Sequence, residues 1–140
     1  MNNFIFENSS KVYFGEGCVK EYLSNILSAY GDTVMFCYGG GSIKKNGIYD
    51  EVITVLKKEN KAVVEFSGIP SNPTYSKVLE GVKLAKEKNA DLILAVGGGS
   101  VMDCCKAISL GAKYDGDIWA DFWARPGVID FEPLPLGMIV

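Results

Sequence analysis

"DLILAVGGGSVMDCCKAI", residues 91–108, joins an apolar run to three glycines and then to a helical pattern. The run at residues 92–96 is continuously apolar, as expected of a strand buried on both faces of a parallel sheet. Glycine loses more conformational freedom on folding than any other residue. Gly97, Gly98 and Gly99 in succession therefore require a compensating interaction, and the position of this turn suggests which one.

The same alternation of strand and helix runs through the first two thirds of the chain. Apolar runs predict strands, and 3.6-residue periodicity predicts helices. The expected strands cover residues 33–38, 61–66 and 92–96, and the expected helices cover residues 18–30, 48–60, 75–89 and the segment after Gly99. Thr74 is the expected N-cap of the third helix. This order predicts an α/β fold, a Rossmann-like, mainly parallel sheet with helices on both faces.

The two ends of the chain depart from this alternation. Phe4–Phe6 and Lys11–Gly15 flank the polar tetrad ENSS and predict an N-terminal β-hairpin. Residues 113–135 lack sustained periodicity and are expected to be mostly irregular. Residues 134–140 resemble the start of another buried strand. We therefore expect residues 1–140 to be one domain and the front part of a longer protein.

Composition restricts the partners. The 140 residues are 48% hydrophobic and carry a net charge of −3, which argues against a broad electrostatic grip on nucleic acid. No apolar stretch approaches the ~20 residues needed to cross a bilayer, and no signal peptide is visible. We expect a cytoplasmic protein with neither a nucleic-acid nor a membrane partner.

Two residue types limit the chemistry. The cysteines form no CxxC pair and are expected to be reduced thiols packed as small hydrophobes: Cys18, Cys37, Cys104 and Cys105. The sequence contains no histidine, the commonest metal ligand and general base. The chain therefore lacks the usual ligand of a metal site and the usual catalytic base.

The second glycine turn, Gly97 to Gly99, lies where open parallel sheets bind ligands, outside the carboxyl end of a strand and at a helix N-terminus. Glycines there would let a pyrophosphate approach the backbone, and the Ser100 hydroxyl could cap the helix or bind a phosphate oxygen. A tight turn alone would need only one or two glycines. The pattern is not GxGxxG, because Met102 occupies the last glycine position, and no Walker A motif is present.

The first glycine turn bears on the choice of coenzyme. It comprises Gly39, Gly40, Gly41 and Ser42, followed by Lys44 and Lys45. An acidic residue at such a strand end commonly binds the ribose 2′-hydroxyl of NAD, whereas the 2′-phosphate of NADP needs its absence and a nearby cation. The residues here favour NADP, with NAD as the alternative. The two lysines also fit an ordinary solvated loop.

An acidic residue and a group of aromatic residues each allow two interpretations. Asp103 follows Ser100 by three residues, in the expected first turn of the helix, where it would either stabilise the helix or face a ligand. Three aromatic side chains either pack in the core or wall a pocket: Trp119, Phe122 and Trp123.

The motif VGGGSVMDCCKAI, residues 96–108, resembles the group III, iron-containing alcohol dehydrogenases, especially their butanol dehydrogenase branch. Further stretches also resemble this family: KVYFGEG (11–17), YGGGSIKKNGIYDEV (38–52), SGIPSNPTYSKV (67–78) and PLPLGMIV (133–140). The shorter pattern GGGSxxD also occurs in glycerol dehydrogenase and dehydroquinate synthase-like proteins. Such a relative is therefore an alternative.

The resemblance implies an N-terminal dinucleotide-binding domain followed by a helical domain, with a divalent metal (Fe²⁺ or Zn²⁺) and the substrate between them. It places the pyrophosphate on Gly97–Gly99 and Ser100, Asp103 on the nicotinamide side, and Asn72 near the adenosine. Gly39, Gly40 and Ser42 stand where NAD-preferring members carry an aspartate. The metal ligands of the family, one aspartate and three histidines, come from the helical domain, so this chain alone is expected to be inactive.

The leading hypothesis is the coenzyme-binding front part of an NADP-dependent oxidoreductase that transfers hydride between nicotinamide and a primary alcohol or aldehyde such as butanol or butanal. The alternative from another class is a stand-alone nucleotide-binding module without catalysis. The face that would meet a helical domain should be apolar. We therefore expect self-association into a homo-oligomer such as a dimer.

Overall fold

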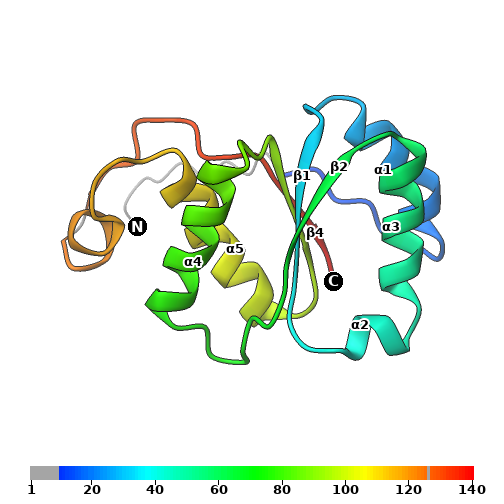
Figure 1. The fold of residues 1–140 in the computed structure, drawn as a ribbon, viewed down its shortest axis with the longest axis horizontal. Coiled ribbons are helices and arrows are strands. Elements are labelled where there is room, and N and C mark those ends of the chain that lie inside the picture. The colour runs from blue at the N-terminus through cyan, green and yellow to red at the C-terminus, as the bar shows by residue number, and fades with distance from the viewer. Residues whose placement is uncertain (1–9, 126) are drawn as a thin grey trace, which may run out of the picture.

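The computed structural model describes residues 10–125 and 127–140. It contains one parallel sheet with helices on both faces (Figure 1), which confirms the predicted fold class. The strands lie in the order β2-β1-β3-β4, and every neighbouring pair is parallel. Their bounds are β1 Thr33–Tyr38, β2 Ala62–Phe66, β3 Leu92–Val96 and β4 Leu136–Ile139.

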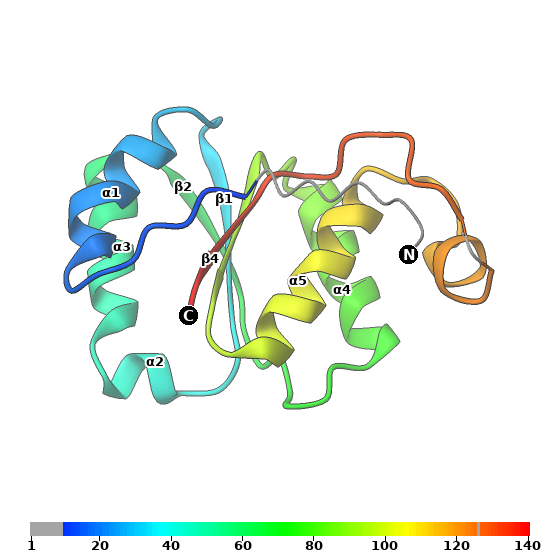
Figure 2. The same ribbon diagram turned by 180° about the vertical axis from the view of Figure 1, so that it is seen from behind.

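The helices form two layers, as the opposite views of Figures 1 and 2 show. One layer contains α1 (Cys18–Leu27), α2 (Ser42–Lys45) and α3 (Ile48–Lys58), and the other contains α4 (Tyr75–Glu87) and α5 (Gly99–Ala112). Thr74 caps α4 as predicted, because its hydroxyl accepts the Lys77 N–H at 3.3 Å. The short helix α2 was not predicted, since four residues are too few to show a 3.6-residue period.

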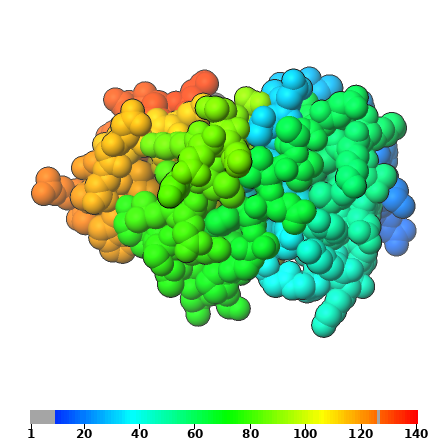
Figure 3. Space-filling view, in the orientation of Figure 1, coloured from blue at the N-terminus to red at the C-terminus, as the bar shows by residue number. Residues whose placement is uncertain are grey.

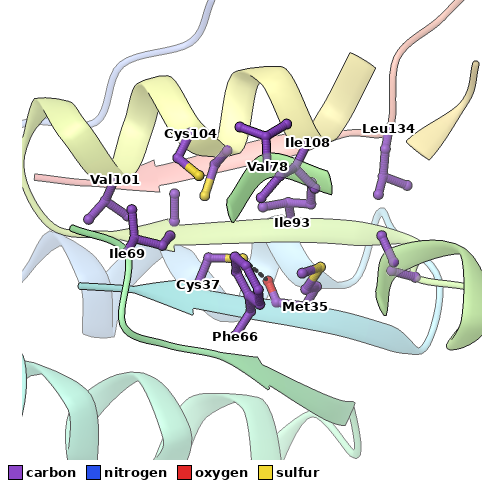
Figure 4. Close-up of a cluster of buried hydrophobic side chains, with 14 of the residues drawn as sticks. Met35, Cys37, Phe66, Ile69, Val78, Ile93, Val101, Cys104, Ile108 and Leu134 are labelled. Atoms are coloured by element: carbon purple, nitrogen blue, oxygen red, sulfur yellow. Dashed lines mark hydrogen bonds between the residues drawn. The ribbon is translucent and has the colours of Figure 1, made fainter. Parts of the chain in front are cut away.

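Strand alternation divides the core between the two layers. In β1, Val34, Phe36 and Tyr38 pack in the cluster on the α1 and α3 side. Met35 and Cys37 pack in the cluster beneath α4 and α5, part of which is drawn in Figure 4. Both central strands are thus buried on two faces, which explains why their sequences are continuously apolar.

Three of the four cysteines are core groups with free thiols, as predicted, whereas Cys18 is only half-buried at the start of α1. Cys37, Cys104 and Cys105 are at most 1% exposed. A hydrogen bond with Cys105, together with burial, raises the pKa of Cys37 well above its ordinary value, and burial raises the pKa of Cys104 to about 11. Since only the thiolate is an effective nucleophile, these side chains serve packing and not thiol chemistry.

The predicted N-terminal hairpin was wrong where the structure tests it. Phe4–Phe6 lies outside the described residues, but residues 10–14 belong to no strand, so Lys11–Gly15 is not a hairpin arm. Val12 and Phe14 are 83% and 99% exposed. This segment therefore gains no apolar burial that would hold it in a sheet.

The described residues of the segment 113–135 are mostly irregular, as predicted, apart from the π-helical turn η1 (Trp119–Trp123); β4 follows this segment. The expected burial of β4 is incomplete, because it is an edge strand whose residues are half-buried or exposed. Of the three aromatic residues, Phe122 packs against the core, whereas Trp119 and Trp123 are 52% and 49% exposed. Within the described residues, no helix is long and apolar enough to span a membrane.

Exposed apolar side chains near η1 generate a prediction about association. Trp119, Trp123 and Ile129 are each about half exposed, and the second half of α5 borders a hollow of about 510 Å³ lined in part by Trp123 and Ile129. Figure 3 shows the η1 region, in orange, at one end of the molecule. Light scattering at high concentration should detect dimers or larger species. The Trp123→Lys variant should weaken this association, whereas Tyr30→Ser in the other helical layer should not; a monomeric wild-type chain would contradict the prediction.

Candidate functional site

The two glycine turns meet at one edge of the sheet because β1 and β3 are adjacent and parallel. Tyr38 and Val96, the last residues of these strands, are partners in register. The turns that follow them must therefore lie side by side. This edge is the point at which the chain order reverses, with β2 on one side of β1 and β3 on the other, where open α/β sheets bind ligands.

The loop that follows β2 completes the site. The Gly68 N–H donates to the Gly39 carbonyl at 2.9 Å, and the Ile69 N–H donates to the Tyr38 carbonyl at 3.4 Å. These bonds hold the loop against the first glycine turn. The result is a shallow pocket of about 250 Å³, lined by Gly39, Gly40, Ile69, Pro70, Ser71, Gly98, Gly99, Ser100 and Val101.

The glycines of this site have two different roles. Gly97 is required by the fold, because its φ is +147° and an added Cβ would lie 2.9 Å from Cγ2 of Val101. At Gly39 an added Cβ would lie 3.2 Å from the Ile69 carbonyl oxygen. By contrast, Gly40, Gly98 and Gly99 face open space. The last three leave room above the backbone for a ligand.

The start of α5 gives this space its electrostatic character. The N-cap is Gly98, which supplies no side-chain cap, so the N–H groups of Gly99 and Ser100 have no partner within the helix. Unpaired N–H groups and the positive end of the helix dipole favour an anion. The site therefore suits a phosphate group that approaches the backbone closely.

Ser100 does not cap the helix. Its hydroxyl donates to the carbonyl of Ser71, which ties the first turn of α5 to the loop after β2. The capping interpretation was therefore wrong, because the helix begins at Gly99 with Gly98 as its N-cap, and Ser100 lies inside the first turn. The bond fixes one wall of the pocket.

Other residues selected from the sequence lie outside the pocket lining. Gly41 and Ser42 are exposed at the start of α2. Asn72 is exposed and follows Ser71 in the chain. Gly97 precedes Gly98 in the turn and does not line the pocket. Asp103 is in the second turn of α5, not the first, because the helix begins at Gly99. Its carboxylate lies 3.3 Å from the Lys106 ammonium and borders the larger hollow near Trp123.

Four pocket residues were not predicted from the sequence: Val101 in α5, and Ile69, Pro70 and Ser71 in the loop after β2. Asn72 was selected from the same loop because of the family resemblance, whereas its neighbours carry no charge or catalytic group. Their contribution is backbone and shape. A signal for them existed in the Pro and Gly content of SGIPSNP, which predicted a loop but not its contact with the glycine turn.

A polar cluster lies beside the first glycine turn. The two carboxylate oxygens of Glu65 accept one hydroxyl each, from Tyr38 and from Tyr49, both at 2.6 Å. The Lys44 ammonium lies 4.6 Å from the ring centroid of Tyr49 and 5.4 Å from that of Tyr38. We call these four residues the Glu65 cluster.

Ionisation in the Glu65 cluster follows from these contacts. The tyrosine hydroxyls, first Tyr38 and then Tyr49, lower the pKa of Glu65, and the nearby Lys44 charge acts in the same direction. The hydrogen bond to Glu65 raises the pKa of Tyr49 to about 12. At neutral pH Glu65 is therefore ionised and both tyrosines are protonated, so each carboxylate oxygen already has a donor.

The described residues do not fit the metal of the resembled family. No three His, Cys, Asp or Glu side chains are grouped there as metal ligands, and the sequence has no histidine. We derive no step through a metal for this chain.

The two classes of glycine predict opposite outcomes for alanine substitution. Gly97→Ala should destabilise the fold by about 1–3 kcal/mol, because φ and the Val101 contact oppose a side chain. Gly99→Ala, at an open helical position, should leave the free energy of unfolding unchanged or higher. Urea unfolding measures both. Equal stability of the two variants would show that the turn tolerates a side chain at Gly97.

The Glu65 cluster predicts a pH dependence with two limits. The lowered pKa of Glu65 contributes stability above its unfolded value of about 4.5, which is lost as pH falls through the folded pKa. The raised pKa of Tyr49 contributes stability below pH 10, which is lost as pH rises through about 12. In urea unfolding at several pH values, Glu65→Gln should show a smaller loss of the free energy of unfolding at both acidic and alkaline pH than the wild type. Glu16→Gln, at an exposed position, should match the wild type.

Comparison with known proteins places this site in a family. The profile of the iron-containing alcohol dehydrogenases matches residues 9–140. The chain is 46% identical over 140 residues to the probable NADH-dependent butanol dehydrogenase 2 of Bacillus subtilis, covering all of this chain and 35% of that protein. It is 40% identical over 118 residues to the NADPH-dependent aldehyde reductase YqhD of Escherichia coli, covering 84% of this chain and 30% of that protein.

The fold agrees with this relationship. The crystal structure of NADH-dependent butanol dehydrogenase A from Thermotoga maritima superposes with a TM-score of 0.87 at 43% identity, covering 99% of this chain and 34% of that one. The chain thus spans about a third of the length of these relatives. Sequence profile, identity and superposition agree, and the chain belongs to the iron-containing alcohol dehydrogenase family.

Proposed function

We propose that this chain is the coenzyme-binding portion of an NADP-dependent alcohol or aldehyde oxidoreductase of the cytoplasm. The observation that carries the proposal is the open backbone at Gly40, Gly98 and Gly99, together with the unpaired N–H groups that begin α5. A dinucleotide is a diphosphate with two flat ends, so it needs an anion site with free space on either side. Family membership supports the same ligand class.

The chain's own residues would bind and orient the coenzyme. The N–H groups of Gly99 and Ser100 would bind the diphosphate, and the first glycine turn would receive the adenosine ribose. The nicotinamide ring, when bound, supplies or accepts the hydride exchanged with a primary alcohol or aldehyde. Pocket residues would hold the dinucleotide in place, and no step on the substrate itself is assigned to them.

NADP is favoured over NAD by the residues beside the first turn. Positions 39–42 carry no carboxylate, so nothing in that turn repels a 2′-phosphate. Glu65 is the nearest acid in the adjacent strand, and both of its oxygens already accept tyrosine hydroxyls. Of the three relatives described above, two are named for NADH and one for NADPH. The proposal of NADP therefore rests on the residues of this chain.

The proposal is tested with the protein produced from its complete native gene. This protein is titrated with NADPH and, separately, with NADH. NADPH should change the fluorescence of Trp119 and Trp123 and bind at least about tenfold more tightly than NADH, since a 2′-phosphate contact is charge-assisted. Consumption of NADPH with butanal then tests the reaction class.

Variants locate the binding. Gly98→Asp adds a carboxylate where the diphosphate would lie and should weaken both coenzymes at least about tenfold. Asn25→Asp adds the same charge on α1 and should change neither. Absence of binding by either coenzyme would overturn the proposal, tighter NADH binding would overturn the coenzyme choice, and binding without turnover would favour a nucleotide-binding module.

A further inference from the structure

We propose that Lys44 is the residue that selects the 2′-phosphate of NADP, and that Tyr38, Tyr49 and Glu65 are positioning residues that hold its ammonium group beside the first glycine turn. This inference rests on the proposed function, since it concerns the same coenzyme site. It distinguishes two adjacent lysines that the sequence alone leaves equivalent.

The two lysines differ in their surroundings. The Lys44 ammonium lies over two tyrosine rings, at 4.6 and 5.4 Å from their centroids. In the described part of the chain, the Lys45 side chain has no hydrogen bond, ion pair or ring contact. Both side chains are exposed. Lys44 is thus a held but accessible cation, whereas Lys45 is an ordinary solvated one.

The position of Lys44 follows from the short helix α2. The Lys44 N–H donates to the Gly41 carbonyl at 3.2 Å, so the chain turns back immediately after the glycines. One of the rings beneath the ammonium belongs to Tyr38, the residue directly before the pocket-lining Gly39. Figure 1 shows α2 at the same edge of the sheet as the start of α5. The cation is therefore on the adenosine side of the pocket.

The rings are themselves held in place. Tyr38 and Tyr49 meet edge to face with centroids 5.7 Å apart, and each donates its hydroxyl to a different oxygen of Glu65. One carboxylate from β2 thus fixes a ring from β1 and a ring from α3. Because the rings cannot turn without breaking a charge-assisted hydrogen bond, the surface beneath Lys44 is preset.

A preset cation improves selectivity for a physical reason. Ordering a free lysine side chain on binding loses rotamer entropy, whereas a side chain already confined by two rings loses less. The gain applies only to a ligand with an anion at this point. NADP has a phosphate there and NAD has a hydroxyl, so the cluster should change the affinity ratio of the two coenzymes and leave diphosphate binding unaffected.

The decisive experiment compares variants of the two lysines in the protein produced from its complete native gene. Dissociation constants for NADPH and NADH are measured by fluorescence titration, and thermal unfolding checks that each variant is folded. Lys44→Met should weaken NADPH about tenfold and NADH less than about twofold. Lys45→Met removes the same charge one residue away and should weaken NADPH less than about threefold. Lys44→Arg should retain most of the selectivity.

Two tyrosine variants test positioning. Tyr49→Leu removes a ring under the ammonium and should reduce the NADPH-to-NADH affinity ratio by about three- to fivefold. Tyr49→Phe keeps the ring but loses the hydroxyl to Glu65, so it should fall between Tyr49→Leu and wild type. A purely structural role would instead lower both affinities together.

The possible results are separable. Equal effects of Lys44→Met and Lys45→Met, or no effect of Lys44→Met on NADPH, would overturn the inference while leaving coenzyme binding intact. Tyr49 variants that match wild type in affinity ratio would overturn the positioning role. A wild-type protein that binds neither coenzyme would overturn the proposed function, and this inference with it.

Discussion

The candidate site depends on the parallel pairing of β1 with β3. This pairing sets Tyr38 beside Val96, and both strands then end in glycine turns at the same edge of the sheet. Because the side chains of both strands are buried on two faces, a shift of one residue in register would exchange the residues of the two core clusters. The register that buries the core is therefore the one that aligns the turns.

The loop after β2 is held by the same pairing. Gly68 and Ile69 donate to carbonyls at the end of β1, and Ser100 at the start of α5 donates to Ser71 in this loop. The pocket wall is thus made of backbone from three turns joined by hydrogen bonds. Glycine has two uses at this site, since Gly97, outside the pocket lining, serves the turn, whereas Gly98 and Gly99 provide ligand space.

The sequence predicted those parts of the fold in which local pattern and tertiary environment agree. β1 and β3 have the predicted bounds, because each is a fully apolar run that ends at a glycine. The hairpin arm at Lys11–Gly15 failed for the opposite reason: its alternation is strand-like, but Val12 and Phe14 find no surface to pack against. A periodic pattern predicts a strand only where something covers one of its faces.

The candidate site was likewise predictable from the sequence only where its residues form a local pattern. Both glycine turns were visible in the sequence, because each is a contiguous motif. The Glu65 cluster was not, because its four members come from β1, α2, α3 and β2 and no contiguous motif joins them. In the fold Glu65 lies in the neighbouring strand β2, and each of its carboxylate oxygens accepts a hydrogen bond from a tyrosine hydroxyl. Under the proposed function, this acid would lie near the adenosine site without favouring NAD, because its acceptor positions orient two aromatic rings beneath a cation.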